Sequence, residues 1–84
     1  MNDARRYLDL LGFKAKDKIT GIEGIITSVC FDLYGCIQIV LHPGLDKDGK
    51  IREQNYFDVN RMELIGPRAM IPPTFDDLPD PPLW

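Results

Sequence analysis

The chain of 84 residues has no apolar run that approaches the roughly 20 residues of a membrane-spanning helix. Its first residues, MNDARRYLDLLGFKAKDK, mix acids and bases with apolar side chains, so they lack the continuous apolar region of a secretory signal. We therefore expect a cytoplasmic protein with no membrane partner. A chain this short buries only about 60% of its unfolded surface, which predicts one small domain.

An excess of positive charge is also missing. The sequence has 10 Lys and Arg against 13 Asp and Glu, and residues 1–66 are close to neutral, with nine bases and ten acids. Proteins that neutralise phosphates normally carry a basic surplus, because their affinity comes from releasing counterions. The charge balance therefore disfavours nucleic acid as a partner.

Motifs for catalysis and for metal binding are absent as well. No nucleophile has a recognisable base beside it, and there is no phosphate loop, dinucleotide fingerprint or Cys-x-x-Cys pair. The single histidine, His42, lies six residues after Cys36, roughly 20 Å along a strand, which disfavours a zinc site. Asp46 and Asp48 resemble the start of a calcium loop, but its remaining ligands are missing. We expect no metal, no cofactor and no enzymatic activity.

The patterns that are present are mainly those of β-structure. We expect a short helix over residues 2–11, ended by Gly12, and then five strands. Their expected ranges are 14–20, 25–31, 36–41, 53–59 and 64–65, with a single helical turn at 60–63. Within 53–59, Phe57 should point inward and Tyr56 outward.

Proline divides the chain into two parts. Six of the seven prolines fall in residues 67–84, so this tail should be extended, and the folded domain should be residues 1–66. Either the tail lies on a surface through apolar anchors or it stays loose in solvent. The candidate anchors are Met70, Ile71, Phe75, Leu78, Leu83 and Trp84.

The only two cysteines flank the turn of the expected hairpin 25–41. A three-residue loop of Leu33, Tyr34 and Gly35 pairs apolar with apolar, for example Phe31 with Ile37 and Thr27 with Leu41. Cys30 and Cys36 then become diagonal neighbours, roughly 7–8 Å apart, which is too far for a disulfide. Free thiols are expected, and a redox or ligand-contacting role for them stays open.

This register predicts an outer face that is unusually apolar for exposure to solvent. Such a face favours contact with a partner, another copy of the chain included, or with the tail. The candidate binding surface consists of Ile26, Ser28, Cys30, Cys36, Gln38, Val40 and His42, together with Tyr34 and Tyr56.

The order of elements and the segments DKITGIEGIITS, FDLYGC and YFDVNRMELI resemble a family of short SH3-like barrel proteins from phages and integron gene cassettes. The resemblance covers residues 12–66 and implies a five-stranded SH3-like barrel, a mobile-element context and self-association. More distantly, the plan is similar to the tetrameric type II dihydrofolate reductases. Gln54-Asn55-Tyr56-Phe57 lacks the order of their Val-Gln-Ile-Tyr pore motif, so reductase activity is not implied.

Three functions follow as hypotheses. The first is a non-enzymatic binding or adaptor module, homo-oligomeric, serving as an accessory protein of a phage or mobile element. The second is a protein or enzyme that binds a nucleotide-like ligand in a cleft between subunits, and the third is a nucleic-acid-binding barrel. The ligand site of the second would use Tyr34, Tyr56 and Trp84 for stacking and Lys16, Lys18 and Arg61 for phosphate.

Overall fold

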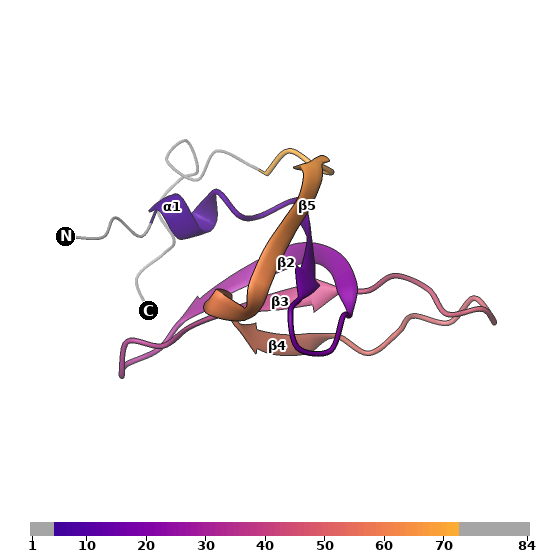
Figure 1. Cartoon of the computed structure of the whole chain (residues 1–84), viewed down its shortest axis with the longest axis horizontal. Helices are drawn as coiled ribbons and strands as arrows, with labels where there is room; N and C mark the ends of the chain where they lie inside the picture. The colour runs from indigo at the N-terminus through magenta and orange to yellow at the C-terminus, as the bar shows by residue number, and fades with distance from the viewer. Residues whose placement is uncertain (1–4, 73–84) are drawn as a thin grey trace, which may run out of the picture.

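The computed structural model describes residues 5–72 and shows a mainly β protein with one short helix (Figure 1). Five antiparallel strands form one sheet in the order β4-β3-β2-β1-β5. The elements are α1 (Arg5–Leu8), β1 (Phe13–Asp17), β2 (Glu23–Phe31), β3 (Ile37–His42), β4 (Asn55–Asp58), the 3-10 turn η1 (Val59–Arg61) and β5 (Met62–Arg68).

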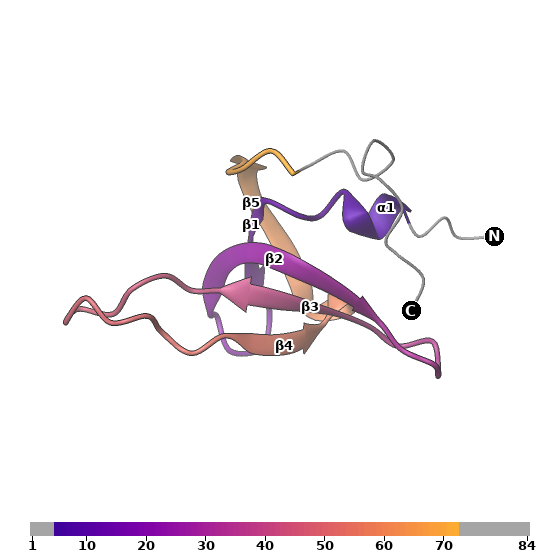
Figure 2. The same cartoon turned by 180° about the vertical axis from the view of Figure 1, so that it is seen from behind.

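The long strand β2 connects the two halves of the sheet. Its first residues pair with β1, and from Ile25 to Phe31 it pairs with β3. Figures 1 and 2 show β1 and β5 crossing steeply over the layer of β2, β3 and β4. Within the described residues the edge strands β4 and β5 do not pair with each other, so the sheet is not closed into the expected barrel.

The β2–β3 hairpin confirms the predicted register next to its turn. Phe31 pairs with Ile37, and Gly35 has a φ of 86°, which a glycine adopts without strain. The expected pair of Thr27 with Leu41 is wrong, because a β-bulge lies between Ile26 and Ser28. Ile26 pairs with Leu41 instead.

The core is built by residues of β1, β2, β3 and β4. Its fully or nearly fully buried members are Ala15, Ile26, Ile39, Leu41 and Phe57. Phe57 is 7% exposed and its neighbour Tyr56 is 65% exposed, which confirms the predicted alternation along this strand. Leu10 and Leu11, after α1, pack against the edge of this cluster.

Both ends of the expected folded domain differ from the prediction. The helix is only four residues long within the described part, residues 9–12 form turns, and residues 2–4 of the expected helix lie outside the described part. The last strand is longer than the predicted 64–65 and continues through Pro67 to Arg68. The Arg68 guanidinium donates to the carbonyl of Asp9 and lies over the Phe13 ring, 4.6 Å from its centroid, so it joins β5 to the N-terminal turn. The anchors Phe75, Leu78, Leu83 and Trp84 lie outside the described residues.

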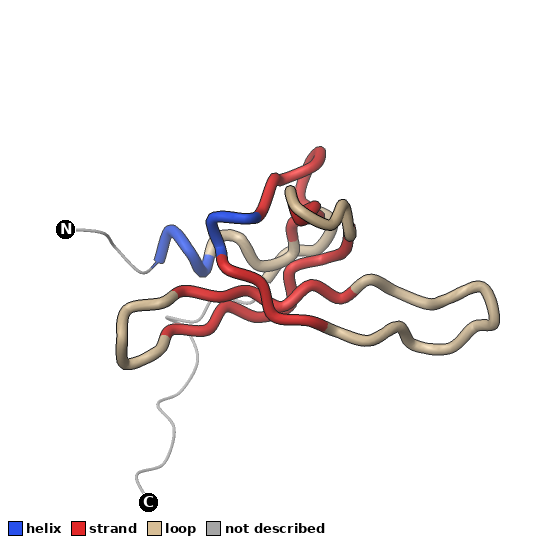
Figure 3. The backbone as a smooth tube through the Cα atoms, turned by 60° about the horizontal axis from the view of Figure 1, so that its bottom comes forward, coloured by secondary structure: helices blue, strands red, loops and turns tan. Residues whose placement is uncertain are grey.

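The loop between β3 and β4 is an ordered arm. Leu45 and Ile51 form an antiparallel bridge, and the Asp46 carboxylate accepts hydrogen bonds from the backbone of Asp48 and Lys50, both at 2.9 Å. Asp48 and Gly49 therefore lie at the tip of a short hairpin. Figure 3 shows this arm and the β2–β3 turn projecting from opposite ends of the molecule. In residues 5–72, no helix has the length and apolar character needed to cross a bilayer.

Candidate binding surface

The bulge in β2 changes the composition of the candidate binding surface. We expected Ile26 on the outer face, but its side chain is 1% exposed and belongs to the core. The extra residue at Thr27 shifts the alternation by one, so the larger apolar Ile26 turns inward and Thr27 is exposed. The placement of Ile26 on a partner-facing surface is therefore wrong.

The remaining outer-face residues form rows across the strands. Ser28 pairs with Val40, which pairs with Tyr56 on β4, and Cys30 pairs with Gln38 in the next row. Val40 is 8% exposed and Cys30 is partly buried, whereas Ser28, Gln38 and Tyr56 are exposed. The outer face is consequently more polar than the sequence predicted.

Exposed apolar surface gathers instead at the tip of the β2–β3 hairpin. Leu33 is 91% exposed and Tyr34 is 88% exposed. The turn that carries them is held by the Asp32 carboxylate, which accepts from the backbone N–H of Tyr34 and of Cys36, both at 2.9 Å. Two large apolar side chains are therefore presented to solvent on a preorganised turn.

The side of the hairpin that faces the core supports this tip. The ring of Phe31 contacts that of Tyr7 on α1 edge to face, with 6.2 Å between centroids. Figures 1 and 2 show α1 lying beside the distal part of the β2–β3 hairpin. The tip projects beyond this contact, so the helix leaves Leu33 and Tyr34 uncovered.

The two thiols are free in the structure. Cys36 is exposed and lies beside Asp32, whose negative charge raises the pKa of the thiol above its ordinary value of 9.0; burial adds to this effect. A protonated thiol is a weak nucleophile and a poor metal ligand. Residues 5–72 hold no group of three His, Cys, Asp or Glu side chains arranged to bind a metal ion.

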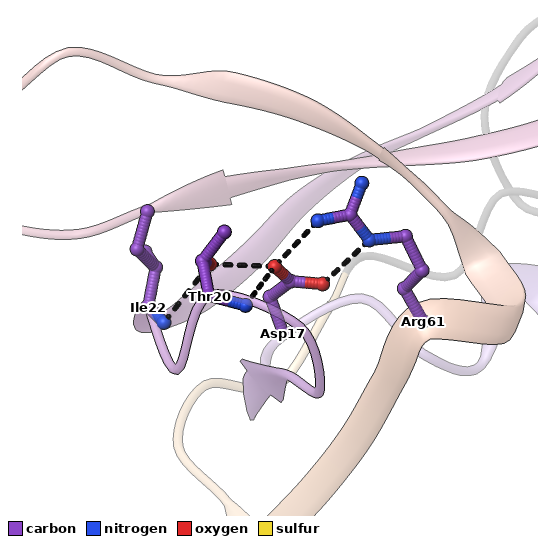
Figure 4. A network of polar contacts seen from close by, with 4 residues as sticks. All are labelled: Asp17, Thr20, Ile22 and Arg61. Atoms are coloured by element: carbon purple, nitrogen blue, oxygen red, sulfur yellow. Dashed lines mark hydrogen bonds and ion pairs between the residues drawn. The ribbon is translucent and has the colours of Figure 1, made fainter.

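A buried polar network stabilises the opposite part of the sheet (Figure 4). Asp17 is fully buried at the end of β1 and accepts two bonds from Arg61, from Nε at 2.7 Å and from an Nη at 2.6 Å. Thr20 donates to the same carboxylate through its backbone N–H at 2.9 Å and its hydroxyl at 2.5 Å. The hydrogen-bonded Arg61 guanidinium holds the pKa of Asp17 well below its ordinary value of 3.8; burial opposes this, and the bonds from Thr20 add to the lowering.

This network removes Arg61 from the predicted phosphate-contacting set. Its guanidinium is turned toward Asp17, and it also lies over the Phe57 ring, 5.2 Å from the centroid. Lys16 has a carboxylate of its own nearby, because its Nζ lies 3.9 Å from Glu63. Arg61 and Lys16, two of the three residues expected to contact phosphate, therefore lie beside acidic side chains of the same chain instead.

The predicted stacking residues are also separated. Tyr56 pairs with Val40 in the middle of the sheet, and Tyr34 lies at the hairpin tip, several residue pairs away. The third member, Trp84, lies outside the described residues. Within residues 5–72 no single site gathers the aromatic and cationic groups of the nucleotide hypothesis.

A cleft of about 660 Å³ lies beside the first residues of β2 and the end of β3, and we call it the bend cleft. Its lining includes Ile25 on β2 and His42 on β3, which pair with each other. His42 accepts at Nδ1 from the backbone N–H of Gly44 at 3.1 Å, so in the neutral ring the proton is on Nε2. The cleft is lined by Lys14, Glu23, Gly24, Ile25, Thr27, His42, Pro43, Gly44, Arg52 and Met70.

Scans of protein-family models, of curated proteins and of solved structures each find no match to the chain.

Six exposed large apolar residues were not predicted as candidates: Ile19, Phe31, Leu33 at the hairpin tip, Leu45 and Ile51 on the arm, and Leu64. Leu45 is 61% exposed and Ile51 is 70% exposed. The signal in the sequence was the near-symmetric placement of Leu45 and Ile51 around the Asp48-Gly49 turn, which is typical of a cross-strand pair. Lys14 and Arg52 in the bend cleft carried no such signal.

Proposed function

We propose that this protein is a non-enzymatic binding module that associates with another copy of itself through the tip of the β2–β3 hairpin. The observation that carries the proposal is the exposure of Leu33 and Tyr34, 91% and 88%, on a turn fixed by the Asp32 carboxylate. Tyrosine is frequent among the residues that dominate binding energy, and a rigid turn loses little conformational entropy on binding.

The small core supports self-association. Five residues form the buried cluster in the described part of the chain, whereas several large apolar side chains remain exposed on the two hairpin ends. A domain of this size gains stability when such surface is buried against a second copy. In a symmetric dimer, the tip of each copy would be buried against the tip of the other copy.

The fold and the biological setting extend this proposal. Five antiparallel strands, a 3-10 turn before the last strand and the return of β5 to β1 support an SH3-like barrel plan. An accessory role on a phage or mobile element is supported by the sequence resemblance, which also implies self-association.

Sedimentation velocity over a wide range of protein concentration tests the proposal. We expect the wild-type protein to form a larger species as its concentration rises, and we expect the double variant Leu33→Asp, Tyr34→Ser to remain monomeric. The matched control is Ile19→Asp, which changes a 73% exposed aliphatic residue in a different turn. Both variants should keep the wild-type circular dichroism spectrum.

Two results would contradict the proposal. A wild-type protein that stays monomeric at every concentration removes self-association. An oligomer that persists in the tip variant but dissociates in Ile19→Asp places the contact on the other turn.

A further inference from the structure

The bend cleft shares lining residues with a second hollow, which lies beside the turn that follows α1. This second hollow has a volume of about 360 Å³ and is lined by Leu11, Gly12, Ile25, Ile26, Thr27, Met70, Ile71 and Pro72. Ile25, Thr27 and Met70 line both spaces, so the two form one groove across the bend of β2. We call the combined space the bend groove.

The chain itself enters this groove at the end of the described part. The backbone N–H groups of Ala69 and Met70 both donate to the carbonyl of Gly12, at 2.8 and 3.0 Å, which fixes the chain where β5 ends. Pro72, the last described residue, is part of the groove lining. The described part of the chain therefore ends at the groove, and twelve more residues of the sequence follow Pro72.

The apolar part of the groove is open to solvent in the described residues. Met70 is 62% exposed and Ile71 is 91% exposed, although both line the second hollow. Covering them with an apolar side chain is favourable, because burial contributes about 25 cal/mol per Å² of apolar area. Phe75 is three residues beyond Pro72 and is the nearest large apolar residue in the following segment.

The polar part of the groove carries unpaired positive charge. Lys14 and Arg52 line the bend cleft, and within residues 5–72 neither side chain has an acidic partner. Glu23 is the one acidic side chain of the lining, so the two bases outnumber it. Residues 73–84 contain three aspartates, at positions 76, 77 and 80, and no lysine or arginine. The charges of the groove and of this segment are complementary.

The acidic residues of the segment begin four positions after Pro72. In a polyproline II conformation, four residues span about 12 Å, which is the distance that Asp76 can extend from Pro72. Proline-rich segments favour this extended form before binding and lose little entropy when they bind.

We propose that the bend groove is a binding site for an acidic, proline-rich extended segment, and that residues 73–84 of the same chain occupy it. Phe75 covers Ile25 and Met70, and Asp76 and Asp77 lie toward Lys14 and Arg52. This inference does not depend on self-association through the hairpin tip.

Nuclear Overhauser contacts in the full chain test the proposal directly. We expect contacts between the Phe75 ring and the methyl groups of Ile25 and Met70. An equal mixture of labelled and unlabelled chains distinguishes contacts within one chain from contacts between chains. The absence of these contacts, or their occurrence only between chains, would overturn the proposal. Phe75→Ala should shift the Ile25 and Met70 methyl resonances and leave that of Ile39 in the core unchanged.

A pair of charge reversals tests the electrostatic part. Lys14→Glu removes a positive charge from the groove, and Lys47→Glu makes the same change on the tip of the arm, outside the groove lining. We expect the Phe75 contacts to weaken in Lys14→Glu and to persist in Lys47→Glu. Equal contacts in both variants would overturn the assignment of the aspartates to this cleft.

Discussion

Replacing Gly12 by alanine tests how β5 is held against the rest of the sheet. Gly12 has a φ of 88°, and its carbonyl accepts the bonds from Ala69 and Met70. A Cβ atom at this position would lie 2.0 Å from the carbonyl oxygen of Met70. Gly21 is the matched control, because its φ is 78° and a Cβ there meets nothing within 4 Å.

The two substitutions share one destabilising effect and differ in a second. A left-handed backbone costs an L-residue about 1 to 2 kcal/mol, and this cost applies to both variants. In Gly12→Ala, relief of the overlap requires residues 69 and 70 to move away, which breaks both hydrogen bonds. Each such bond contributes about 0.5 to 1.5 kcal/mol, so Gly12→Ala should lose about 1 to 3 kcal/mol more than Gly21→Ala.

Urea unfolding at a single pH measures this difference. We expect Gly12→Ala to have the lower free energy of unfolding, with a similar dependence on urea concentration in both variants. Faster amide exchange at Ala69 and Met70 should accompany the loss in Gly12→Ala. Equal destabilisation of the two variants would refute the packing of Gly12 against Met70.

Three further outcomes follow from the buried network, the hairpin turn and the core. Because the pKa of Asp17 is lower in the folded protein than in the unfolded chain, its stabilising effect is complete above about pH 5 and is lost as the pH falls through the unfolded value of 3.8 toward the lower folded value. Urea unfolding should show a shallower loss in acid for Arg61→Gln, and a loss as steep as in the wild type would contradict this. Asp32→Asn should lower the pKa of Cys36 and speed its alkylation near neutral pH, and an unchanged rate would argue against the charge effect. Ile39→Ala should lower the free energy of unfolding by about 2 to 5 kcal/mol in denaturant titrations, because its side chain is fully buried; a loss below this range would mean that the core closes around the cavity.

Local patterns predicted much of the fold. The pairing of Phe31 with Ile37 and the turn at Gly35 depend on residues close together in the chain, and both were predicted. The inward Phe57 and outward Tyr56 follow from the two-residue period of a strand. Short-range geometry and side-chain polarity were sufficient for these features.

The candidate surface was predicted less well. Periodicity alone could not show whether Ile26 or Thr27 would face the core, because a β-bulge has no distinctive sequence pattern within a run of β-branched residues. Because Ile26 was placed on the outer face, that face was expected to be more apolar than it is. The exposed Leu33 was in the predicted loop, but its 91% exposure depends on how far the hairpin projects beyond α1.

By itself the sequence determined the β-rich class, the hairpin turn and the near-neutral domain, since each depends on composition or on neighbouring residues. Tertiary structure alone decided the partner of Asp17, because Arg61 is 44 residues away and is aligned with it only by the pairing of β1 and β5. It also decided that Lys14, Arg52 and Met70 share one cleft. Contacts between distant segments depend on how the strands bend and cross, and no local pattern encodes that geometry.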